Sequence, residues 1–134
     1  MLAALPESPE RAAKRASELG ARRVADEARG YGLEALLAHY LPDAFPLRRE
    51  ERLGLAFRSA QALRTTVEIV RLLESAGVEV LVLKGAALAT RLYPHAWLRP
   101  SSDIDLLVRP REVERGIAAL EAAGWSLSIG PRQS

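Results

Sequence analysis

Cysteine is absent from this chain of 134 residues, and histidine occurs only as His39 and His95. Without cysteine, the protein has no disulfide scaffold, thiolate zinc site, iron–sulfur cluster or cysteine nucleophile. With two histidines, a histidine-rich metal site is implausible. The composition therefore argues against thiol redox chemistry and against zinc centres built from cysteine or histidine.

Aromatic residues are also scarce, and neither sign of charge is in large excess. Aromatics make up 5% of the chain, which offers no stacking platform for nucleic-acid bases. The net charge is +2, with 11 Lys and Arg against 9 Asp and Glu in residues 1–67 and 8 against 8 in residues 68–134. Because the charge is spread so evenly, nucleic-acid binding is not indicated.

Long apolar runs are missing as well. The longest, Val80–Leu83 and Gly85–Ala89, fall far short of a membrane span. The first residues, Met1–Glu7, lack the basic start and long apolar segment of a secretory signal. We therefore expect a cytoplasmic protein that does not enter a membrane.

Hydrophobic residues make up 49% of the chain, which is enough to bury a core. The patterning predicts helices over residues 9–29, 33–40 and 48–75, and then strands over 78–83, 103–108 and 125–129 that alternate with helices over 86–92 and 110–124. This order predicts an α+β fold, in which a helical N-terminal region (residues 1–76) packs on a small mixed β-sheet.

The long helix predicted over residues 48–75 carries apolar residues at three- and four-residue steps. Such spacing places them on one helix face, which we expect to pack in the core. The residues of this face are Leu53, Phe57, Ala60, Leu63, Val67, Val70 and Leu73.

The triplet Asp103-Ile104-Asp105 is the most informative motif. Successive side chains of a strand alternate between its faces, so the two aspartates share one face with their backbones about 7 Å apart. Two such carboxylates repel each other, and a hard divalent cation between them makes the arrangement favourable. Oxygen ligands alone indicate Mg²⁺ or Mn²⁺. The alternative is a solvent-facing pair bonded to Arg99 or Arg109.

Lys84-Gly85 directly follows the first predicted strand. A glycine there lets the backbone approach a ligand closely, and the helix that begins near Ala86 offers free N–H groups and its positive dipole end to phosphate oxygens. Lys84 adds a cation. The alternative interpretation is an ordinary strand-to-helix turn that needs a glycine for its geometry.

The loop before the aspartates supplies further polar groups. Arg99 and Ser102 are placed to reach a triphosphate or to cap the strand entrance. For Arg91 and Ser101, we favour a solvated loop without a role in binding.

Three runs in order carry a family resemblance: Leu83-Lys-Gly-Ala-Ala-Leu88, Leu92-Tyr-Pro94 and Arg99-Pro-Ser-Ser-Asp-Ile-Asp-Leu-Leu-Val108. Together they resemble the uncharacterised nucleotidyltransferase family of the DNA polymerase β-like superfamily, over Gly77 to about Trp125. The resemblance implies that residues 77–134 form a partial nucleotidyltransferase core. It also implies that an acceptor hydroxyl attacks the α-phosphate of an NTP with the help of Mg²⁺ or Mn²⁺.

The resemblance assigns roles residue by residue. Asp103 and Asp105 are the expected catalytic residues and metal ligands. The expected nucleotide-binding residues are Lys84, Gly85, Ala86, Arg99 and Ser102.

One departure from the family pattern concerns a third carboxylate, which active members carry on a later strand. After Asp105 the only acids are Glu112, Glu114 and Glu121, all on a predicted helix. Two alternatives stay open: a fragment of a longer nucleotidyltransferase whose missing strand lies beyond Ile129, or a non-catalytic nucleotide- or partner-binding module of an antitoxin-like or regulatory kind. In either case the sheet edge beside Trp125–Ile129 is exposed, which predicts a homodimer through that edge or a tendency to aggregate.

Overall fold

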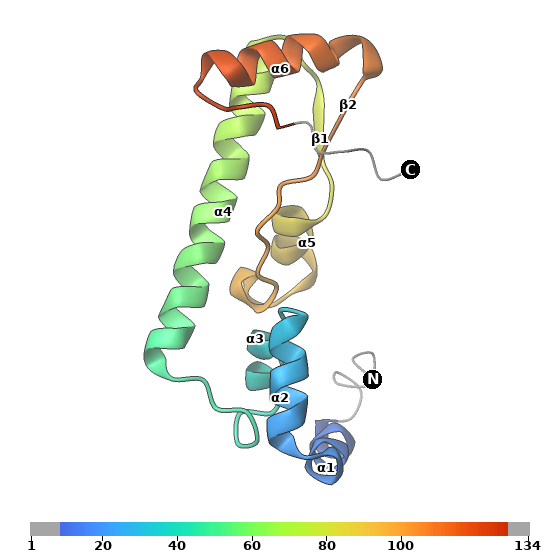
Figure 1. Cartoon of the computed structure of the whole chain (residues 1–134), viewed down its shortest axis with the longest axis vertical. Helices are drawn as coiled ribbons and strands as arrows, with labels where there is room; N and C mark the ends of the chain where they lie inside the picture. Colours follow the sequence, from blue (N-terminus) through green and yellow to red (C-terminus); the bar gives the residue numbers. More distant parts are fainter. Residues whose placement is uncertain (1–8, 129–134) are drawn as a thin grey trace.

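The structure is a computed structural model that describes residues 9–128. Long helix α4 runs along one side of the molecule, the two short strands lie near one end of it, and the N-terminal helices lie near the other (Figure 1). The elements in chain order are α1 (Pro9–Leu19), α2 (Ala21–Gly30), α3 (Glu34–Tyr40), α4 (Arg49–Ser75), β1 (Val80–Val82), α5 (Gly85–Leu92), η2 (Ala96–Leu98), β2 (Leu106–Val108), η3 (Pro110–Glu112) and α6 (Val113–Ala122).

The N-terminal helices form a small core of their own. Ala16, Ala28 and Leu37, one from each of α1, α2 and α3, are buried together with Leu41 and Phe45. The prediction of a single helix over residues 9–29 is wrong, because this segment forms two helices, α1 and α2, that are separated at Gly20. This glycine has φ +89°, a left-handed conformation that ends a right-handed helix.

Helix α4 begins and ends with recognisable caps. The Glu51 carboxylate accepts a hydrogen bond of 2.8 Å from the Arg48 backbone N–H. At the other end, Gly77 has φ +73°, and the Val78 N–H donates to the Leu73 carbonyl at 2.9 Å, as in a Schellman motif. The cap turns the chain directly into β1.

The face of α4 predicted to lie in the core is mostly exposed. The buried residues of α4 are Leu55, Thr66, Ile69 and Leu73, whereas Leu53, Phe57, Leu63 and Val67 are exposed. Both sets have helical spacing, so periodicity alone could not choose between them. The choice is made by α3 and η2, which cover Leu55, and by the strands and α6, which cover Ile69 and Leu73.

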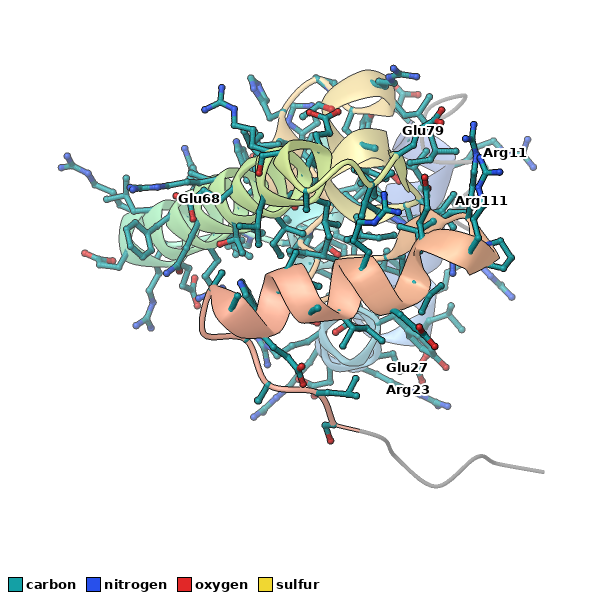
Figure 2. The ribbon with its side chains drawn as sticks, turned by 90° about the horizontal axis from the view of Figure 1, so that it is seen from above. Arg11, Arg23, Glu27, Glu68, Glu79 and Arg111 are labelled. Atoms are coloured by element: carbon teal, nitrogen blue, oxygen red, sulfur yellow. The ribbon has the colours of Figure 1, made fainter. Side chains whose placement is uncertain are left out.

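The two strands pair antiparallel, with Val80 opposite Val108, Leu81 opposite Leu107 and Val82 opposite Leu106. One face of this sheet packs on α4 and α6 through Val80, Ile104, Leu106 and Val108. Figure 2 shows α6 lying across the end of α4. The predicted α+β fold is confirmed, with strands shorter than residues 78–83 and 103–108.

The third strand expected over residues 125–129 does not form at Trp125–Ser128, and Ile129 lies outside the described residues. Gly124 has φ +94°, and the Trp125 N–H donates to the Leu120 carbonyl at 3.0 Å. Trp125 thus completes the cap of α6, and its backbone donor is not offered to a neighbouring strand. Within residues 9–128 the sheet is therefore a two-stranded antiparallel one rather than a mixed one.

A third cluster joins the N-terminal helices to the segment before β2. Ala35 of α3, Leu55 of α4 and Leu98 of η2 are all buried in it. Each of these side chains is at most 3% exposed, so the loop from Tyr93 to Ser102 is anchored at its centre. Burial of Leu98 thus fixes the path by which the chain reaches Asp103.

We expect Leu73→Ala to lower the free energy of unfolding by about 2–5 kcal/mol, because Leu73 is 2% exposed in the core beneath the sheet. Leu92→Ala is the control: this leucine is 70% exposed, and its replacement should change stability by no more than about 0.5 kcal/mol. Urea unfolding followed by circular dichroism measures both. Equal losses in the two variants would contradict this packing.

Candidate functional site

The antiparallel register brings the two sequence motifs together. Beyond the last strand pair, the Leu83 N–H donates to the Asp105 carbonyl at 2.9 Å. Continuing the same register places Gly85 opposite Asp103, and the two residues are in close contact. The Lys84-Gly85 turn and the Asp103-Ile104-Asp105 triplet are therefore neighbours, although about twenty residues separate them along the chain.

The two aspartates lie on the outer face of the paired segments. Ile104 packs with Leu106 and Val108 in the core, whereas Asp103 and Asp105 are exposed. This is the alternation predicted from the sequence, even though both aspartates precede β2, which begins at Leu106. Both carboxylates thus face away from α4 and α6 and are open to a ligand.

Lys84 provides a positive charge beside this pair. Its Nζ lies 4.0 Å from Asp105 Oδ2, and the two side chains are 71% and 49% exposed. An ion pair that is so exposed contributes little to stability, and the lysine can exchange it for another anion. Lys84 also has φ +36°, the only positive φ among the described non-glycine residues. Such backbone strain is found preferentially at functional sites.

Gly85 is the first residue of α5, and any side chain at this position would be strained. It is buried with φ +51°, and an added Cβ would lie 3.0 Å from Ser101 Oγ and 3.3 Å from the Asp103 carbonyl oxygen. The Ser101 hydroxyl in turn donates to that carbonyl at 3.0 Å. The glycine thus lets α5 begin directly against the aspartate segment.

The start of α5 has free hydrogen-bond donors. The first N–H groups of any helix lack partners within it, and Lys84 makes no side-chain cap for α5. Gly85 and Ala86 therefore present backbone donors at the positive end of the helix dipole, next to the aspartates. The arrangement suits a ligand that carries both a cation and negatively charged oxygens.

Arg99 and Ser102 take different places. Arg99 is half-buried and lines a small pocket of about 260 Å³, a volume that includes space open to solvent. The pocket lining also includes Ser59 and Leu63 of α4, Ala86 and Thr90 of α5, and Ser101. Ser102 is exposed in the bend before Asp103. The pocket adjoins the start of α5, because its lining includes Ala86 of that helix and Ser101, which contacts Gly85.

Ser101 is the residue that the sequence reasoning missed. It was expected in a solvated loop, but it is half-buried, bonds to the Asp103 carbonyl and packs against Gly85. Its position two residues before Asp103 is a signal for a local turn bond, because serine hydroxyls often bond the backbone over this spacing. Its contact with Gly85 depends on the pairing of β1 with β2, and no local sequence pattern predicts such a contact.

Arg109 does not neutralise the aspartates. It pairs with Glu79, at the end of the sheet away from Asp105. The alternative in which this arginine bonds to the aspartate pair is therefore wrong.

No third acid joins the pair within the part of the chain that the structure describes, residues 9–128. Glu112 belongs to η3, and Glu114 and Glu121 belong to α6, which covers the opposite face of the sheet. Glu112 is 8% exposed, and its Oε2 atom has no hydrogen-bond partner. The departure noted in the sequence thus holds for residues 9–128.

A family model described as "Uncharacterised nucleotidyltransferase" matches residues 11–131, which is most of the chain. The family resemblance inferred from Lys84-Gly85 and the aspartate triplet is thereby confirmed. No curated protein and no solved structure matches the chain. None of the helices within residues 9–128 is both long and apolar enough to cross a membrane.

We expect Gly85→Ala to destabilise the protein by about 1–2 kcal/mol, because the added Cβ meets Ser101 and Asp103 in a left-handed conformation. Gly30→Ala serves as the control. An added Cβ at Gly30 meets nothing within 4 Å, so that this variant should be as stable as the wild type or up to about 1 kcal/mol more stable. Thermal and urea unfolding compare them, and a neutral Gly85→Ala would contradict the close approach.

Proposed function

The chain belongs to the uncharacterised nucleotidyltransferase family, and on that basis we propose that it binds an NTP and transfers the NMP group to a hydroxyl of an acceptor. The observation that carries the proposal is the pairing of the Lys84-Gly85 turn with Asp103 and Asp105. It sets donors for phosphate oxygens beside two exposed carboxylates. Since NTPs are cytoplasmic metabolites, we place the protein in the cytoplasm.

The two carboxylates fit a hard divalent cation, Mg²⁺ or Mn²⁺. They are oxygen donors on one exposed face, and Lys84 is the one cation paired with them within the described residues. Asp103 and Asp105 would hold the ion, and phosphate oxygens and water would fill its remaining positions. When bound, such an ion offsets the charge of the triphosphate and polarises the α-phosphate.

The remaining residues of the turn would bind the triphosphate. The Gly85 and Ala86 N–H groups donate to phosphate oxygens, and Lys84 moves from Asp105 to the phosphates. Ser102 lies directly before Asp103 and can donate from its exposed hydroxyl, and Arg99 adds a positive charge from the adjacent pocket. These contacts hold the β- and γ-phosphates and so orient the α-phosphorus.

The transfer itself exchanges one phosphorus–oxygen bond for another. The acceptor oxygen attacks the α-phosphorus, the bond to the bridging oxygen of the β-phosphate breaks, and pyrophosphate leaves with that electron pair. The proton of the hydroxyl passes to water or to a base. This chain's contribution is to position the triphosphate and to stabilise its charge.

A second candidate function is binding of a nucleotide or a partner without turnover, as in an antitoxin-like or regulatory module. It is favoured by one observation: within residues 9–128 no third acid stands beside Asp103 and Asp105 to act as the general base. Release of pyrophosphate from labelled NTP separates the two functions, because binding alone leaves the NTP intact.

Calorimetric titration of each Mg²⁺–NTP tests the site. We expect saturable binding that needs the metal and that Asp103→Asn/Asp105→Asn weakens by at least about 100-fold, because two charge-assisted contacts of roughly 1.5–3 kcal/mol each are lost. Glu114→Gln/Glu121→Gln removes two exposed acids from α6 and should leave binding unchanged. Equal affinities of the aspartate variant and the wild type would refute the site.

The chain has only two lysines, Lys84 and Lys14, which gives a matched pair of variants. We expect Lys84→Met to weaken NTP binding by about 10- to 100-fold, because the loss of one charge-assisted contact costs roughly 1.5–3 kcal/mol. Lys14→Met alters an exposed residue of α1 and should bind like the wild type. If the two variants lose affinity equally, Lys84 has no specific role at the phosphates.

A further inference from the structure

The outer face of α4 carries an apolar stripe that no described element covers. Leu53 and Phe57 are 58% and 69% exposed, and Val67 is 39% exposed. Figure 1 shows α4 on the rim of the molecule, with α6 across its upper end and most other elements on one side of it. An apolar stripe along one face of a helix usually marks an interaction surface.

The exposed residues of α4 repeat with heptad spacing. The positions at alternating three- and four-residue steps are Glu50, Leu53, Phe57, Ala60, Arg64, Val67 and Arg71, and all seven are exposed. This spacing is typical of a helix that pairs with another helix along its length. The smallest residue of the series, Ala60, lies near the middle, where it permits close approach of a partner backbone.

We propose that this face binds the same face of a second copy of the chain, with the two α4 helices antiparallel and crossing at Ala60. A two-fold symmetric interface must be complementary to itself. About a centre at Ala60, Leu53 lies opposite the partner's Val67, and Phe57 lies opposite the partner's Arg64. One apolar contact and one cation–π contact therefore form on each side of the two-fold axis of the dimer.

Charge complementarity argues for this occupant and orientation. In the antiparallel arrangement Glu50 lies opposite the partner's Arg71. This pair occurs twice by symmetry and joins unlike charges at both ends of the apolar stripe. A parallel arrangement would instead place each charged residue beside its own copy, which is repulsive.

The dimer leaves both candidate nucleotide sites open. Asp103 and Asp105 lie on the sheet face turned away from α4, and the stripe lies on the face of α4 turned away from the sheet. Dimerisation is thus independent of NTP binding, and each proposal can fail without the other.

Disulfide cross-linking tests the register, because the chain has no cysteine of its own. Under mild oxidation in dilute solution, Ala60→Cys should form a covalent dimer, since the two copies of residue 60 meet at the axis. Ser75→Cys, at the exposed end of the same helix, should remain monomeric in the denaturing gel. Its two copies would lie roughly 45 Å apart at a rise of 1.5 Å per residue. Equal cross-linking of the two variants would overturn the proposal.

Sedimentation equilibrium of variants without cysteine tests the contacts. We expect the wild type to be a dimer and Phe57→Asp to associate at least about 30-fold more weakly. Glu50→Arg and Arg71→Glu should each weaken the dimer, and the double variant should restore it, because the two charges are then exchanged. A monomeric wild type at high concentration would overturn the proposal. So would a dimer insensitive to Phe57→Asp, because its interface would lie elsewhere, for example at the free sheet edges.

Discussion

The antiparallel pairing of β1 with β2 is the constraint on which the candidate site depends. Its register places Val82 opposite Leu106, and the Leu83–Asp105 hydrogen bond extends it to the turn. Because side chains alternate along a strand, this register also turns Ile104 into the core and the aspartates outward. A slip of one residue would reverse both faces and bury two carboxylates. The core beneath the sheet, centred on Leu73, therefore holds the site together without touching it.

The turn between β1 and α5 stores strain where the chemistry is expected. Lys84 and Gly85 are consecutive residues with positive φ, and the glycine lies against Ser101 and the Asp103 backbone. The pairing and packing of the strands stabilise this conformation, whose cost falls on Lys84, because a glycine adopts a positive φ readily. In return, the donors of α5 and the Lys84 ammonium lie beside the carboxylates, and no loop within residues 9–128 closes over them. The site is thus preformed on one side and open on the other.

Helix α4 connects the parts of the molecule. Leu55 packs with α3 and η2, and Ile69 and Leu73 pack beneath the sheet, so one helix face spans two of the three clusters. The same helix leaves Leu53 and Phe57 exposed. A helix that is apolar on two faces needs two partners, and the described residues supply one of them. The self-complementary charges at its ends make a second copy the natural second partner.

The sequence determined most local features: the helices apart from the break at Gly20, the two strands, the alternation through Asp103-Ile104-Asp105, and the glycine turn after β1. These depend on backbone preferences and on neighbours within a few residues. The tertiary structure decided the rest. It determined which face of α4 is buried, the contact of Ser101 with Gly85, the position of Arg99 in the pocket and the absence of a strand at Trp125–Ser128. Each of them follows from contacts between segments far apart in the chain, or from competition for one backbone donor. Periodicity within a single segment carries no information about which distant surface will cover it.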